Sequence, residues 1–179
     1  MDAAHLAERI RVTAGGKKEE ARAAVALIFR EHEGTLQLLL VKRAIVEGDP
    51  WSGDMAFPGG KRMKEDHSIM DTVVREVQEE TGIDLRACRH LGSMGTVYST
   101  VRPTLGVLPL AFLRDSDSEI RMNEELVSYQ WVDLKRLQAS RGRATVKGRD
   151  VPAYLIAGEV VWGLTYRIIE RLLEIIGQG

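Results

Sequence analysis

The chain has 179 residues, a length typical of one domain with enough sequence to bury a core. Hydrophobic residues make up 44% of it and charged residues 28%, and 25 basic against 26 acidic side chains give a formal net charge of −1. This near-neutral balance argues against nucleic-acid and membrane-surface partners, which bind through a basic excess. The longest apolar runs fall far short of the ~20 residues that a membrane-spanning helix needs.

Cysteine usage and the N-terminus both favour a cytoplasmic protein. Cys88 is the only cysteine, so the chain forms no internal disulfide and no Cys-rich zinc site. Its thiol has no recognisable base partner, and we expect it to be inert. Met1–Arg11 carries charges among its apolar residues and lacks the long apolar core of a signal peptide.

The first part of the chain predicts a short helix followed by a hairpin. Residues 3–10 are expected to form the helix, and the rest of residues 1–20 to be flexible. Ala24–Arg30 and Leu36–Lys42 are nearly all apolar, which predicts two strands buried on both faces. Glu33-Gly34 lies between them and favours a hairpin connection.

The middle of the chain combines a loop, a helix and two further strands. Glu47–Gly60 is rich in glycine and proline and is expected to be loop. His67–Thr81 predicts a helix, closed by Gly82 in the position where helices commonly end. Leu105–Leu113 and Val127–Val132 predict the strands.

The last segment, Gly163–Ile176, predicts a second long helix with an apolar face at helical spacing. This face can pack internally or against a second copy of the chain. Strands mixed with two main helices predict an α/β fold, in which a mixed sheet lies between helices in an α/β/α sandwich. We expect one domain over residues 1–179.

The chemistry is concentrated in the predicted helix before Gly82. Glu76, Glu79 and Glu80 are related by i, i+3 and i+4 and therefore share one helix face. Their mutual repulsion destabilises the helix unless cations neutralise them, and Arg75 supplies only one positive charge. Carboxylate oxygens suit a hard cation such as magnesium. Taken alone, such an acidic run is more often an ordinary solvated helix face.

The extended pattern from Gly60 to Ile83 resembles the Nudix box: Gly, five residues, Glu, seven residues, Arg-Glu-aliphatic-x-Glu-Glu-x-Gly-aliphatic. The second half matches completely, with Val77 at the first aliphatic position. The first half departs from the general box in two ways. Asp66 stands where the general box has Glu, and the spacing from Gly60 to the arginine is one residue longer.

The resemblance implies a magnesium-dependent hydrolase, with manganese able to replace magnesium. It implies that the metal ligands are Glu76, Glu79 and Glu80, with the Gly59 carbonyl oxygen as a further ligand. Arg75 then either orients a ligand carboxylate or forms an i, i+4 pair with Glu79, and the two roles are compatible.

Further site residues are expected outside the box helix. In Nudix enzymes the general base comes from the box or from a later loop, and Glu124 and Glu125 are the loop candidates, with Glu125 at the matching position. The alternative to a role as general base is that Glu125 is an ordinary solvated acid in a loop. Arg43, Gly60 and Lys61 are candidates for contacting substrate phosphates, although exposed cations often bind nothing specific. Three tryptophans can stack on a base or simply pack: Trp51, Trp131 and Trp162.

Three stretches resemble the coenzyme A diphosphatase branch of the Nudix family: Phe57–Gly60 followed by Asp66, Leu39–Ala44, and Trp162–Thr165. The branch usually has a further Arg in the region that reads Ile45–Gly53 here, and this chain has none. The function implied is hydrolysis of a diphosphate linkage in a nucleoside diphosphate derivative, with coenzyme A or acyl-coenzyme A leading.

Two alternatives to coenzyme A remain open. ADP-ribose or a dinucleotide is a second substrate class for the same chemistry. A nucleotide-binding Nudix domain without catalysis belongs to another class of function, but such domains commonly lose a box glutamate, and all three are present here. Nudix proteins are often homodimers, so a homodimer is also compatible with the resemblance.

Overall fold

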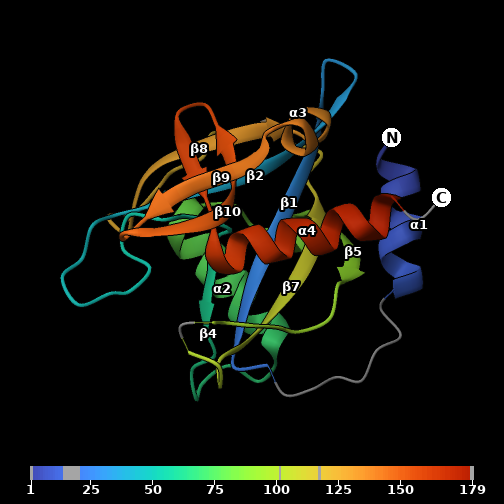
Figure 1. Cartoon of the computed structure of the whole chain (residues 1–179). Coiled ribbons are helices and arrows are strands. Elements are labelled where there is room, and N and C mark those ends of the chain that lie inside the picture. The colour runs from blue at the N-terminus through green and yellow to red at the C-terminus, as the bar shows by residue number, and fades with distance from the viewer. Residues whose placement is uncertain (1, 14–20, 101, 117, 178–179) are drawn as a thin grey trace.

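The computed structural model describes residues 2–13, 21–100, 102–116 and 118–177. Within these ranges a large eight-stranded sheet is covered by helices and flanked by a three-stranded sheet (Figure 1). The large sheet contains β1 (Ala23–His32), β2 (Thr35–Arg43), β3 (Met55–Ala56), β4 (Gly59–Lys61), β5 (Arg89–Ser93), β6 (Val97–Tyr98), β7 (Gly106–Leu113) and β8 (Leu126–Asp133).

The remaining elements are helices and the small sheet. The helices are α1 (Ala3–Thr13), α2 (Ile69–Thr81), the 3₁₀ turn Leu85–Ala87, α3 (Leu134–Ala139) and α4 (Gly163–Gly177). The small sheet consists of β9 (Arg141–Val146), β10 (Arg149–Ile156) and β11 (Glu159–Val161). None of the described helices has the length and apolarity needed to span a membrane.

The large sheet is mixed, as predicted. β1 pairs with β7 in parallel and with β2 in antiparallel orientation. The turn between β1 and β2 consists of Glu33 and Gly34, both with positive φ (49° and 72°), which is typical of a two-residue hairpin whose twist matches its strands. β1 is therefore enclosed by neighbours, which explains its nearly continuous apolar sequence.

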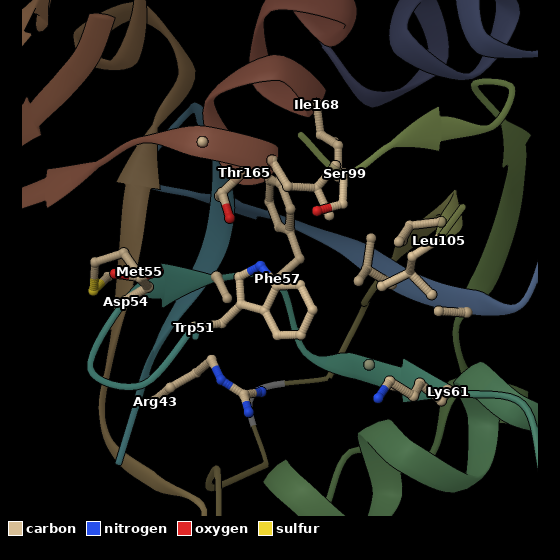
Figure 2. A pocket seen from close by; sticks show the side chains of 18 of the residues that line it. Arg43, Trp51, Asp54, Met55, Phe57, Lys61, Ser99, Leu105, Thr165 and Ile168 are labelled. Carbon is tan, nitrogen blue, oxygen red and sulfur yellow. The ribbon is translucent and has the colours of Figure 1, made fainter. Parts of the chain in front are cut away.

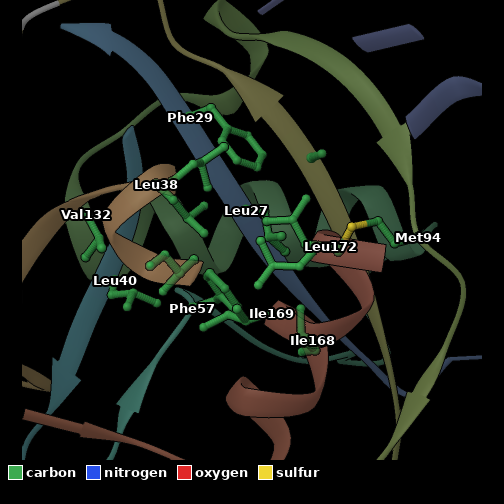
Figure 3. Close-up of a cluster of buried hydrophobic side chains, with 14 of the residues drawn as sticks. Leu27, Phe29, Leu38, Leu40, Phe57, Met94, Val132, Ile168, Ile169 and Leu172 are labelled. Atoms are coloured by element: carbon green, nitrogen blue, oxygen red, sulfur yellow. The ribbon is translucent and has the colours of Figure 1, made fainter. Parts of the chain in front are cut away.

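Helices cover both faces of the sheet, which confirms the predicted sandwich. Side chains alternate along β1, so Leu27 and Phe29 lie in the cluster that contains α1 and α4, whereas Ala26 and Ile28 lie in the cluster that contains α2. In Figure 1, α4 crosses in front of β1 and β7, and α2 lies behind them. Figure 3 shows the α4 side of the core, where Leu27 faces Ile169 and Leu172.

The predicted elements are present with adjusted bounds. The first helix extends to Thr13, three residues beyond the predicted end, and the expected flexible segment at residues 14–20 lies outside the described residues. The helix expected from His67 begins at Ile69, because Ser68 is its N-cap. The loop expected over residues 47–60 is turn only as far as Asp54, after which β3 and β4 pair with β2 and β1.

The apolar face of α4 packs inside the chain. Ile168, Ile169 and Leu172 are at most 1% exposed, and they contact residues of the large sheet and of α1 in one cluster. Tyr154 of β10 and Val161 of β11 belong to the same cluster, so the small sheet extends this core. Of the two alternatives considered from the sequence, packing inside the chain is therefore the one observed for the apolar face of α4.

Truncating the α4 face should destabilise the whole fold. We expect Leu172→Ala to lower the free energy of unfolding by about 2–4 kcal/mol, because it removes buried methyl groups and leaves a cavity. Urea denaturation followed by circular dichroism measures the change. Glu174→Ala, on the exposed side of the same helix, is the control and should stay close to the parent.

Candidate active site

The box helix α2 has well-defined ends that fix which side faces the core. Ser68 Oγ accepts a hydrogen bond from the Asp71 backbone N–H at 3.1 Å, which caps the N-terminus. Gly82 ends the helix with φ at 71°, and its N–H donates to the Gln78 carbonyl. Val73 and Val77 are fully buried against the sheet, so the glutamate face points toward the edge of that core.

Asp66 is the structural acid of the box in this chain. Its side chain is 6% exposed and accepts four hydrogen bonds: from Arg75 Nε at 3.1 Å, Arg75 Nη2 at 2.9 Å, the Met63 N–H at 2.8 Å and Thr72 Oγ1 at 2.9 Å. The Arg75 guanidinium and the other donors hold the pKa of the Asp66 carboxyl well below its usual range. The pair therefore stays ionised and links the loop before the helix to its second turn.

Arg75 also contacts two of the box glutamates. Its Nη1 lies 2.8 Å from Glu76 Oε1 and 3.5 Å from Glu79 Oε2. The orienting contact and the i, i+4 pair considered from the sequence are thus both present. The single Arg75 guanidinium is thus shared among three carboxylates, since Asp66 binds its other edge. The helix face formed by Glu76, Glu79 and Glu80 therefore keeps an excess of negative charge.

Glu80 points inward, toward the strand that precedes the helix. It is 3% exposed, and its Oε2 accepts a hydrogen bond from the Gly59 N–H at 2.8 Å. Burial raises the pKa of Glu80 to about 7, in spite of this hydrogen bond. A nearby positive charge would therefore strongly stabilise the ionised form of Glu80.

Gly59 and Gly60, at the start of the box, have no room for a side chain because other atoms lie very close to their backbone. Gly59 has φ at 147°, and a Cβ there would lie 2.2 Å from the Ala24 carbonyl oxygen. A Cβ at Gly60 would lie 2.4 Å from the Glu76 carboxyl carbon. The Gly60 position thus leaves the space in which the Glu76 carboxylate lies, and burial raises the pKa of that carboxyl against the opposing effect of Arg75.

These residues border a cavity of about 430 Å³. Glu76 and Glu80 line it together with Glu125, which approaches from the loop before β8 and is held there by a hydrogen bond from the Ala44 N–H to the Glu125 carbonyl at 2.8 Å. Glu124 does not line the cavity, so the structure separates the two loop acids. Glu79 also lies outside its lining, with its side chain 56% exposed.

Two cations line the same end of the cavity (Figure 2). Arg43 Nη2 pairs with Asp49 Oδ2 at 2.8 Å, and the buried Arg43 Nε has no hydrogen-bond partner among the described residues. Lys61, next to Gly60, makes no ion pair within the described part of the chain. Figure 2 shows Arg43 and Lys61 near α2, with Ser99 and Thr165 at the opposite end.

The residues fit a divalent cation by donor chemistry. Among the described residues no three acidic, histidine or cysteine side chains converge on one point, because Arg75 holds Glu76 and the Gly59 N–H holds Glu80. The face nevertheless supplies hard oxygen donors with excess negative charge and raised pKa values for Glu76 and Glu80. A magnesium-like ion is the group that such a face accepts best.

Several lining residues were missing from the sequence prediction. Asp49 connects Arg43 to the Trp51 backbone, whose N–H donates to Asp49 Oδ1 at 3.1 Å. Asp54 accepts a hydrogen bond from Trp162 Nε1 at 3.0 Å, and burial raises the pKa of its carboxyl. Both acids lie in an irregular loop without periodicity, so only the tertiary contacts identify them. Trp51 and Trp162 line the cavity, whereas Trp131 packs beside Arg30 elsewhere.

Comparison with known proteins identifies the family. A family model of the NUDIX domain matches residues 19–152. The chain therefore belongs to the Nudix family. It is 31% identical over 138 residues to the uncharacterized Nudix hydrolase NudL of Yersinia enterocolitica, covering 69% of this chain and 66% of NudL. The chain thus spans slightly less than two thirds of that relative.

A second relative matches nearly the full chain. The mitochondrial coenzyme A diphosphatase NUDT8 of Mus musculus is 29% identical over 180 residues, covering 94% of this chain and 84% of NUDT8. Among solved structures, the NUDIX domain of Shewanella oneidensis NrtR complexed with ADP ribose has a TM-score of 0.57 at 18% identity, covering 97% of this chain and 98% of that one. A C. elegans Ap4A hydrolase has a TM-score of 0.53 at 17% identity, covering 65% and 82%. Both likenesses show the fold alone.

Removing the Asp66 carboxylate should destabilise the protein in a pH-dependent way. We expect Asp66→Asn to lower the free energy of unfolding at pH 7 by about 2–4 kcal/mol, since it leaves Arg75 partly buried without its partner. The folded-state pKa of Asp66 is depressed, so its stabilisation is complete above the unfolded pKa of about 4 and is lost as the pH falls.

Urea denaturation at pH 7 and at about pH 3 measures this effect, and the gap between parent and variant should shrink at the lower pH. The neighbouring exposed Glu65→Gln variant is the control. A gap that is equal at both pH values would contradict a charged, buried pair.

Proposed function

We propose that the protein is a magnesium-dependent hydrolase that cleaves the diphosphate linkage of a nucleoside diphosphate derivative, with coenzyme A or an acyl-coenzyme A as the leading substrate. One observation carries the proposal: Glu76, Glu80 and Glu125 line one cavity together with Arg43 and Lys61. Carboxylates suited to a cation and cations suited to phosphates thus meet within a single site.

The reaction needs charge neutralisation, because a diphosphate is a polyanion that repels an attacking water. Glu76, Glu79 and Glu80 would hold the divalent cation, with the Gly59 carbonyl as a further ligand. The bound cation would neutralise phosphate oxygens and lower the pKa of a water molecule. Arg43 and Lys61 bind non-bridging phosphate oxygens, and Asp49 keeps Arg43 in place.

Glu125 is the proposed general base. It lines the cavity from the loop opposite α2, and it carries no ion pair among the described residues. Its carboxylate accepts the proton of the attacking water, while the bond between phosphorus and the bridging oxygen breaks and the second phosphate leaves with the electron pair. Arg75 keeps Glu76 and Glu79 oriented throughout and does not need to touch the substrate.

Support for coenzyme A comes from similarity to the mouse coenzyme A diphosphatase over most of the chain, and from the Phe57–Gly60 and Trp162–Thr165 stretches. The missing Arg in Ile45–Gly53 counts against tight binding of the 3′-phosphate. Loss of a charged hydrogen-bonding contact costs about 1.5–3 kcal/mol, or roughly 10- to 150-fold in affinity. ADP-ribose and dinucleotides are therefore the alternative substrates.

A product assay tests the proposal directly. With magnesium in ¹⁸O-labelled water, we expect coenzyme A to give 4′-phosphopantetheine and adenosine 3′,5′-bisphosphate by mass spectrometry, with the label in one product. ADP-ribose, diadenosine polyphosphates and nucleoside triphosphates are the comparison substrates. Hydrolysis of another nucleotide but not of coenzyme A would refute the substrate. Nucleotide binding without any hydrolysis would favour a non-catalytic domain.

The metal-binding face can be tested by isosteric substitution. We expect Glu79→Gln or Glu80→Gln to lower kcat by at least ~10²-fold, because a lost ligand removes charge stabilisation at the transition state. Magnesium should also raise Tm in the parent but not in Glu80→Gln, which reports binding without turnover. Glu124→Gln, an exposed acid outside the cavity, is the matched control. Near-normal turnover of both box variants at saturating magnesium would place the metal elsewhere.

A further inference from the structure

The loop that lacks the branch's arginine is compact and holds an aromatic ring at the cavity. Its ends are closed by hydrogen bonds from the Arg43 N–H to the Asp54 carbonyl at 3.0 Å and from the Gly53 N–H to the Ala44 carbonyl at 3.3 Å. Inside the loop, Asp49 binds the Trp51 backbone with one carboxylate oxygen and Arg43 with the other. The Trp51 ring is therefore held beside a cation that is suited to phosphate.

A second loop contributes a cation that contacts the Trp51 ring. The guanidinium carbon of Arg102 lies 5.1 Å from the centre of the Trp51 ring. Arg102 is anchored by its backbone, since its N–H donates to Ser99 Oγ at 3.1 Å and its carbonyl accepts from the Leu105 N–H at 2.8 Å. Arg102 is exposed and does not itself line the cavity, whereas Trp51 does, so the pair lies where the cavity meets the molecular surface.

The deep end of the cavity has the opposite character. Phe57, Val107 and Ile168 are at most 4% exposed, and Val25, Leu105 and Leu164 complete this apolar lining. Three hydroxyl side chains also line the cavity, Ser99, Thr100 and Thr165, and Figure 2 shows the first and last of them near Ile168. A nucleobase placed there would leave several ring donors and acceptors without partners, which costs binding free energy. An apolar group would not carry this penalty, and an amphipathic chain would carry less of it where its polar atoms reach the hydroxyls of Ser99 or Thr165.

We propose that Trp51, supported by Arg102, forms the nucleobase subsite, in which the base stacks on the Trp51 indole while Arg102 holds that ring in place, and the non-nucleotide group enters the apolar end. The substrate class is then a nucleoside diphosphate whose second substituent is a largely apolar chain. This rests on the proposed function, since it assigns the two halves of that substrate. Stacking suits any base, because every base presents a π-face.

Binding without turnover tests the subsite. The probes are adenosine diphosphate, which has a base, and inorganic diphosphate, which has none, measured by calorimetry without a divalent metal. We expect Trp51→Ala to weaken adenosine diphosphate binding by about 10- to 100-fold and to leave inorganic diphosphate within about twofold. Trp51→Phe should recover most of the loss, and Arg102→Ala should weaken the base-bearing probe by about 3- to 30-fold.

The chain provides a matched control. Arg30 lies 4.3 Å from the centre of the Trp131 ring, a second cation–aromatic pair that does not line the cavity. Trp131→Phe and Arg30→Ala should leave both affinities unchanged.

Two results would overturn the subsite: unchanged adenosine diphosphate affinity in Trp51→Ala, or an equal loss for both probes, which would mean only that the ring supports the loop. The outcome is separable from the proposed function. A parent that binds adenosine diphosphate through Trp51 but hydrolyses nothing would refute the hydrolase alone, whereas normal hydrolysis with unchanged affinities would refute the subsite alone.

Discussion

The candidate site depends on one buried ion pair, between Asp66 and Arg75. Asp66 is almost fully enclosed and is kept ionised by four hydrogen bonds, so its partner cannot move without leaving a buried charge unpaired. The opposite edge of the same guanidinium holds Glu76 and Glu79. Because α2 is regular from Ile69 onward, the extra residue relative to the general box lies in the loop ahead of the helix.

The pair also leaves an excess of carboxylates on one face of α2, where the proposed divalent cation would bind. Arg75 is shared among Asp66 and two glutamates, while Glu80 is buried with only a backbone N–H as a donor. The strand that carries Gly59 and Gly60 has little room to shift away from these carboxylates, because Gly59 packs against Ala24 and Gly60 packs against Glu76. Packing and electrostatics thus oppose each other at this edge, and the proposed divalent ion would offset the negative charge.

Much of the fold was predictable from apolar patterning, and much of the site was not. β1, β2, β7, β8, α2 and α4 carry apolar sequences with strand or helix spacing, so their presence followed from the sequence. β9 alternates between exposed and half-buried residues with no buried one, which leaves no apolar signal for that strand, and the short apolar stretches of β10 and β11 were not assigned to strands from the sequence. The box is contiguous, which made Glu76 and Glu80 recognisable. Asp49 and Asp54 reach the cavity, and Arg102 reaches the Trp51 ring, only through loop contacts that the sequence pattern does not reveal.

The small sheet, which was not predicted from the sequence, contacts a loop that borders the cavity. At the tip of its first hairpin, Lys147 and Gly148 both have positive φ, as a two-residue turn requires. This tip places Lys147 Nζ 2.8 Å from the Pro50 carbonyl and 5.5 Å from the centre of the Trp162 ring, while Trp162 itself binds Asp54. The loop that carries Trp51 is thus braced at Pro50 and at Asp54 by the C-terminal half of the chain. An aromatic ring held in this way loses little freedom when a planar group stacks on it, so the contacts of the small sheet support binding without touching the substrate.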